Sequence, residues 1–225
     1  MRKTFALLVC LGPLLAAPSA KADSGLFHVV PSLGLASPCD DSGCLYTWSL
    51  ATRLGQALSF AEARYGPRNK AWTILGTEFV SKGHPSVWYP SSDGEFGSIV
   101  IQLTASAARE EVRALFQLAH EVIHILDPAG PSARASILEE GLATLNSVEF
   151  LQSLGMSQGR DDPRFEAAYL AVLELRRQSG DLEAGVRRLR QSAGGLSGIS
   201  AQDIEDAFPG VSPPLAGLLA TNFLR

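Results

Sequence analysis

The segment His120-Glu121-Val122-Ile123-His124 has the residue types and the spacing that could bind a metal ion and activate water. Residues four apart on a helix lie on the same face, with Cβ atoms about 5–6 Å apart, so both histidines could coordinate one ion. Glu121 would lie beside them, where its carboxylate could take a proton from an attacking water molecule. The pattern predicts a hydrolytic metal centre with His120 and His124 as ligands and Glu121 as general base.

A catalytic zinc site needs a third protein ligand and one open position. The segment Leu138-Glu139-Glu140-Gly141-Leu142-Ala143 follows on the next expected helix, and with it the chain resembles the gluzincin metallopeptidases. In that family HExxH is followed by a glutamate ligand in an E-G-x-A type context. The resemblance implies that Glu140, directly before the glycine, is the third ligand of one Zn²⁺ ion. Glu139 is then a neighbour that either hydrogen-bonds to a ligand or is solvated.

Two related zinc-peptidase patterns fit the sequence less well. Metzincins require HExxHxxGxxH, but Asp127 stands at the position of that glycine and Gly130 at the position of the third histidine. Asp127 could be an aspartate ligand, as in aspzincins. Its place before Pro128 is more typical of a residue that ends a helix.

The resemblance also implies a Tyr, His or Arg that stabilises the oxyanion of the reaction. The position of Tyr169, in register with Phe165 on a helix, favours a core residue, and the proline that follows His84 favours a loop residue. The candidates are Tyr169, His84, Tyr89 and Arg134.

Periodicity and turn residues predict the elements that must position these side chains. Thr104 is expected to cap the motif helix, and the Gly/Ser-rich residues 192–200 to form a flexible connection. The strand at 97–103 is either an edge strand that pairs with substrate, as the resemblance implies, or a buried strand of a small sheet. Strands are expected at 71–75, 86–89 and 97–103, and helices at 48–64, 105–126, 133–154, 163–178, 181–191, 201–208 and 214–224.

These elements predict an α+β fold: a zincin-like metallopeptidase domain with a small mixed sheet, two metal-bearing helices and a helical C-terminal subdomain. We expect one catalytic domain over residues 48–225, helical from residue 161 onward, preceded by an arm at 23–47. The 225 residues are 46% hydrophobic and 19% charged, which is typical of a globular protein.

Residues 1–22 have the features of a secretory signal peptide: a basic start, an apolar stretch and the cleavage signal Ala20-Lys21-Ala22. Cleavage after Ala22 would leave 203 residues, exported to the periplasm or secreted, with no membrane span. Cleavage after Ala20 and an uncleaved anchor are alternatives. The mature chain keeps two cysteines around a turn-forming tetrapeptide, which predicts a Cys39–Cys44 disulfide.

The mature chain has 16 basic and 23 acidic residues, a balance that argues against nucleic-acid binding. A group of arginines towards the C-terminus predicts a solvated helical face, with acidic substrates or lipid headgroups as the alternative partners. These residues are Arg176, Arg177, Arg187, Arg188 and Arg190.

The sequence thus favours an exported zinc metallopeptidase acting on peptides or proteins. The main alternative is a catalytically inactive zincin-fold binding or scaffold protein of the cell envelope, which keeps the metal but has no open cleft. In a third alternative the motif arose by chance and the protein binds no metal.

Overall fold

The computed structural model describes residues 50–81, 83–92, 97–159 and 162–224, together with the backbone of residues 39–40 and 43–44. The predicted signal peptide and most of the arm lie outside the described residues. The short strands β1 (Cys39–Asp40) and β2 (Gly43–Cys44) pair antiparallel, with Cys39 opposite Cys44. The side chains of these residues are not among those described, so the disulfide stays a prediction.

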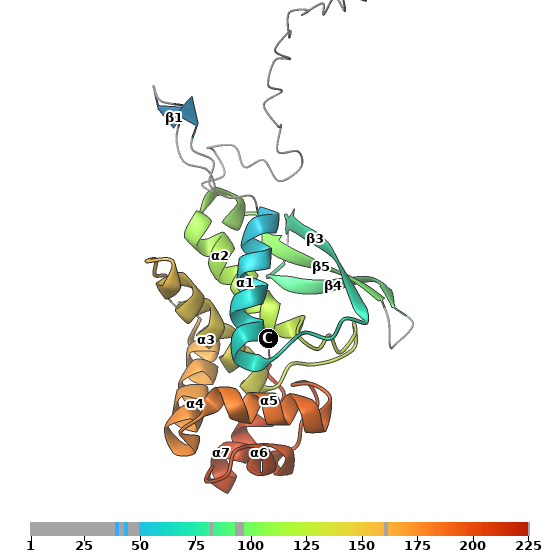
Figure 1. Cartoon of the computed structure of the whole chain (residues 1–225), viewed down its shortest axis with the longest axis vertical. Helices are drawn as coiled ribbons and strands as arrows, with labels where there is room; N and C mark the ends of the chain where they lie inside the picture. The colour runs from blue at the N-terminus through green and yellow to red at the C-terminus, as the bar shows by residue number, and fades with distance from the viewer. Residues whose placement is uncertain are drawn as a thin grey trace, which may run out of the picture.

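In the described part of the chain, seven α-helices and a three-stranded mixed sheet confirm the α+β class (Figure 1). Helix α1 (Leu50–Tyr65) leads to β3 (Trp72–Val80), β4 (Ser86–Ser92) and β5 (Gly97–Thr104). The strand order is β3-β5-β4, with β3 parallel and β4 antiparallel to β5. Since β5 is central, the run at 97–103 is an interior strand, and β4 is an edge strand.

Helix α2 (Glu111–His124) carries the HExxH motif and starts later than the sequence suggests. Thr104 is not its cap: it ends β5 opposite Val80, and its side chain hydrogen-bonds to Gln117. A turn of 3-10 helix (Ala107–Arg109) intervenes, and Glu110 is the residue that precedes α2. The sheet register therefore holds Thr104 extended, and this contact outweighs its preference for a helix N-terminus.

Helix α3 (Ile137–Ser153) begins four residues after the expected start. Residues 135–137 instead pair with a segment near the end of the chain, where the Ile137 N–H donates to the Thr221 carbonyl oxygen (2.8 Å). Ser136 then caps the helix, because its Oγ accepts a hydrogen bond from the Glu139 N–H (3.1 Å). This cap sets the position of the first turn of α3.

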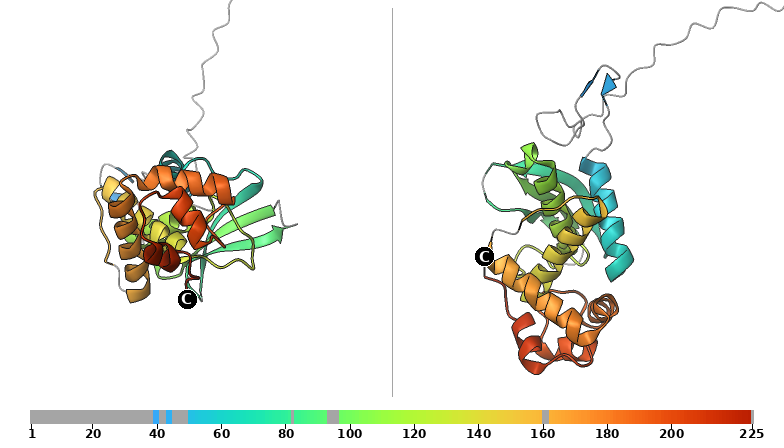
Figure 2. Two further views of the ribbon diagram at one scale, coloured as in Figure 1. Left: turned by 90° about the horizontal axis from the view of Figure 1, so that it is seen from below. Right: turned by 90° about the vertical axis from the view of Figure 1, so that its left-hand side faces the viewer.

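The C-terminal helices gather at the opposite end of the molecule from the sheet (Figures 1 and 2). The expected helix at 214–224 ends at Leu219, and the residues after it run towards α3. The segment 192–200 is more than a connection, since Leu196 and Ile199 are buried. The helices are α4 (Pro163–Ser179), α5 (Leu182–Ala193), α6 (Ala201–Ala207) and α7 (Pro213–Leu219).

The expected solvated face is found only in part on α5, because Arg188 is exposed but Arg187 and Arg190 are partly buried. Arg190 has a side chain only 7% exposed, and it pairs with Asp127 and donates to carbonyl oxygens beyond the ends of α1 and α2. Arg187 donates to the Arg64 carbonyl oxygen, and Arg188 to that of Ala207. These side chains therefore link helices instead of presenting a free basic surface. None of the described helices combines the length and apolar character that crossing a membrane would require.

Candidate metal centre

Helices α2 and α3 pack against each other and bring together the three residues predicted to bind metal. One ligand atom from each of His120, His124 and Glu140 lies within 4.8 Å of the others. Glu140 Oε2 is 3.0 Å from His120 Nε2 and 3.8 Å from His124 Nε2. The four-residue spacing of the histidines along α2 and the position of Glu140 in the first turn of α3 produce this arrangement.

The cluster is buried and rich in negative charge. Glu140 is fully buried and His120 is 7% exposed. Burial by itself would lower the pKa of His124, but Glu140, the hydrogen bond to Glu139 and the charge of Glu121 together raise it to about 9. Carboxylates gathered around two imidazoles favour a bound cation.

Two polar atoms at the cluster support a metal ion on independent grounds. Glu121 Oε2 and His124 Nε2 are buried and have no hydrogen-bond partner. Buried polar atoms in folded proteins are almost always paired, so an orphaned atom calls for a missing partner. A metal ion and its water would supply partners to both atoms, and a His-His-Glu donor set suits zinc.

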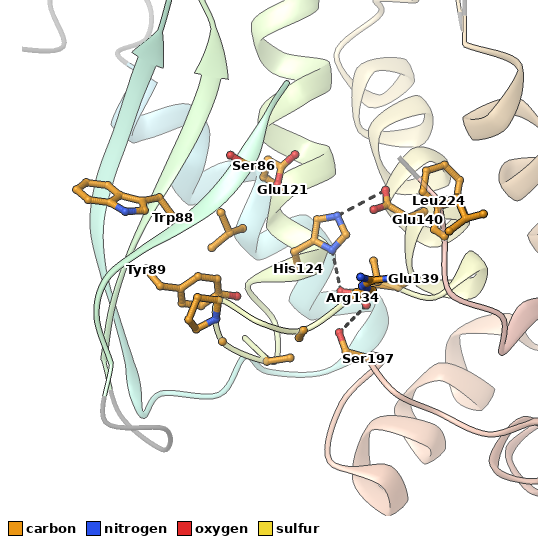
Figure 3. A pocket seen from close by; sticks show the side chains of 17 residues that line it. Ser86, Trp88, Tyr89, Glu121, His124, Arg134, Glu139, Glu140, Ser197 and Leu224 are labelled. Atoms are coloured by element: carbon orange, nitrogen blue, oxygen red, sulfur yellow. Dashed lines mark hydrogen bonds and ion pairs between the residues drawn. The ribbon is translucent and has the colours of Figure 1, made fainter. Parts of the chain in front are cut away.

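Glu139 hydrogen-bonds to His124 of the cluster and is buried, not solvated. Its Oε1 is 2.7 Å from His124 Nδ1, and its Oε2 accepts a hydrogen bond from Ser197 Oγ (2.7 Å) (Figure 3). A carboxylate on Nδ1 fixes the orientation of an imidazole, as is usual for a histidine that binds a metal through Nε2. Sequence reasoning missed Ser197, which lies between α5 and α6 and has no motif around it.

Two cavities meet at Glu121, which lines both. The larger, of about 690 Å³, is bounded by β4, the connection between α2 and α3, and the segment after α7 (Figure 3). The smaller, of about 310 Å³, lies between α2, the start of α4 and the residues before β4. The carboxylate of Glu121 is therefore within reach of molecules that enter either cavity, although the residue itself is 1% exposed.

The structure separates the four oxyanion candidates. Tyr89 and Arg134 line the larger cavity and His84 lines the smaller one, whereas Tyr169 packs against the core. Burial raises the pKa of Tyr89 to about 12, although a hydrogen bond with the Gly130 backbone acts in the opposite direction. The Tyr89 hydroxyl is therefore protonated at neutral pH and is able to donate a hydrogen bond.

Asp127 is not part of the cluster. Its carboxylate accepts a hydrogen bond from Arg190 Nε (2.5 Å), so the structure contradicts the aspartate-ligand alternative. The pair instead links the end of α2 to α5.

No family model, curated protein or solved structure with which the chain was compared matches it. The fold and the site define a mixed α+β domain with a buried His-His-Glu cluster that could hold a metal ion.

Proposed function

We propose that the protein is an exported zinc-dependent metallopeptidase of the gluzincin type, which hydrolyses peptide bonds. The observation that carries the proposal is the unpaired Glu121 carboxylate oxygen, placed beside a three-ligand cluster and between two cavities. When bound, Zn²⁺ would polarise the scissile carbonyl group and make water more acidic.

The residues around the cleft have separate roles in this reaction. His120, His124 and Glu140 hold the zinc ion. Glu121 Oε2 accepts a proton from the attacking water and passes it to the leaving amine, which is the work of a general base and then a general acid. Tyr89, whose side chain lines the larger cavity, donates its hydroxyl hydrogen bond to the developing oxyanion.

Strand β4 offers a binding site for an extended peptide. Among the described strands it pairs on one side only, with β5, and Ser86, Val87, Trp88 and Tyr89 line the larger cavity. A peptide added along this edge would form main-chain hydrogen bonds with any sequence, so that side-chain pockets would decide specificity. The accessible cavities also count against the alternative of a binding protein without a cleft.

The Glu121→Gln variant should keep zinc binding and lose most of the hydrolytic activity. We expect wild type and variant to bind one zinc ion each, measured by elemental analysis. Cleavage of a mixed-sequence peptide library, followed by mass spectrometry, should fall about 10²–10⁴-fold in the variant because the proton acceptor is lost.

Glu110→Gln is the matched control, because Glu110 is an exposed glutamate beside the start of the same helix. It should cleave at the wild-type rate, and a chelator should abolish the activity of both. A wild-type protein that binds zinc stoichiometrically and cleaves no peptide of the library would refute the peptidase. A protein that binds no zinc would refute the metal centre as well.

A further inference from the structure

The segment 221–224, which we call the strap, forms one side of the metal cleft. Its backbone lies antiparallel to residues 135–137, where the Phe223 N–H donates to the Ala135 carbonyl oxygen (2.8 Å). Phe223 and Leu224 line the larger cavity together with Glu121 and Glu140 (Figure 3). The strap is thus hydrogen-bonded to the residues just before α3 and lines the cavity beside the candidate metal centre.

The Phe223 ring continues an aromatic row that starts at the cluster. Its centroid is 4.9 Å from that of Phe165, and the Phe165 ring meets His120 edge-on at 5.5 Å. Phe223 lines the larger cavity, whereas Phe165 lines the smaller one. The two phenylalanines therefore form an apolar wall between the cavities, directly beside a predicted metal ligand.

We propose that Phe223 determines specificity by limiting the size of the substrate side chain accepted beside the scissile bond. This inference rests on the proposed peptidase function. A peptide bond whose leaving amine receives its proton from Glu121 must lie where the two cavities meet. The substrate side chains on either side of that bond must therefore enter these cavities. The ring of Phe223 takes up volume that a bulky side chain would need.

The test compares cleavage-site profiles of zinc-loaded wild type, Phe223→Ala and Phe223→Leu on a mixed-sequence peptide library, read by mass spectrometry. We compare kcat/KM for peptides that carry Trp or Phe next to the cut bond with kcat/KM for peptides that carry Ala there. The ratio of the first to the second should rise about tenfold in Phe223→Ala. Phe223→Leu should be intermediate. Leu218→Ala is the matched control, because it removes an exposed apolar side chain of the neighbouring helix, and it should keep the wild-type profile.

Zinc affinity, measured by chelator competition, should be unchanged in all three variants. An unchanged profile in Phe223→Ala overturns the inference and leaves the peptidase standing. An equal loss on every peptide, together with weaker zinc binding, also overturns it, because Phe223 would then act by positioning Phe165 and His120. If Phe223→Ala does not fold, the profile of Phe223→Leu decides. A zinc-loaded wild type that cleaves nothing refutes both proposals.

Discussion

At the scale of single residues, two adjacent glutamates in the first turn of α3 have different roles. Glu140 lies in the ligand cluster, and Glu139 hydrogen-bonds to the imidazole of His124 and accepts from Ser197. Neighbouring helix positions differ by roughly 100° around the axis, so the two carboxylates approach the histidines from different sides. A shift of the helix by one residue would put one glutamate in the place of the other and leave only one of the two positions occupied by a glutamate. The Ser136 cap holds the register.

This difference predicts unequal effects on metal affinity. Glu140→Ala removes a proposed ligand and should lower zinc affinity more than Glu139→Ala. For Glu139→Ala we expect about a 10–100-fold loss, because only the hydrogen bond that supports a proposed ligand is removed. Chelator competition on the purified variants measures both. Ser197→Ala should have a smaller effect than Glu139→Ala, since it leaves the carboxylate in place. A larger loss in Glu139→Ala than in Glu140→Ala would contradict the assigned ligand set.

At the scale of elements, the close crossing of α3 and α4 requires a glycine directly after the predicted ligand. A Cβ atom at Gly141 would overlap the Ala168 carbonyl oxygen and lie 2.6 Å from Val172 Cγ2. The small residue therefore lets α4 pack directly on the turn that carries Glu140. α4 also brings Phe165 against His120.

Gly141→Ala should consequently destabilise the protein by about 3 kcal/mol, because backbone atoms of α4 cannot move aside as a flexible side chain would. Gly55→Ala is the control: Gly55 lies inside α1, and the added Cβ would meet no atom within 4 Å apart from its chain neighbours and the backbone of its own helix. That substitution should stabilise the protein by about 0.5–1 kcal/mol, since alanine favours the helix. Urea denaturation of both variants gives the two free energies, and similar values would argue against the close crossing.

At the scale of the whole molecule, Arg190 connects the C-terminal helices to the half of the protein that holds the motif. From α5, its guanidinium donates to the Gly66 and Leu126 carbonyl oxygens and pairs with Asp127. Gly66 directly follows α1, and Leu126 and Asp127 follow α2, which is the helix that carries both histidines. One buried cation therefore helps to orient the two parts of the cleft.

Replacing Arg190 by Ala should lower the free energy of unfolding by about 3 kcal/mol, because Asp127 and several carbonyl groups lose a buried partner. Thermal and urea denaturation of the metal-free protein measure the effect. Arg177→Ala is the control, since that side chain is 72% exposed and pairs with Glu174 one turn away. Arg177→Ala should leave the free energy of unfolding unchanged. Equal free energies of unfolding for the two variants would show that Arg190 does not hold the helices together.

Features that depend on short-range periodicity can be predicted from the amino-acid sequence alone. The four-residue spacing placed His120 and His124 on one face of a helix, and the residues around the turns delimited most helices and strands. The partners that distant segments provide follow from the packing of the helices: Ser197 for Glu139, Arg190 for Asp127, and the strap for the start of α3. These contacts join residues about 60 or more positions apart, and no local propensity encodes them. They form only when the helices pack, which is why the motif was visible in the chain and the walls of its cleft were not.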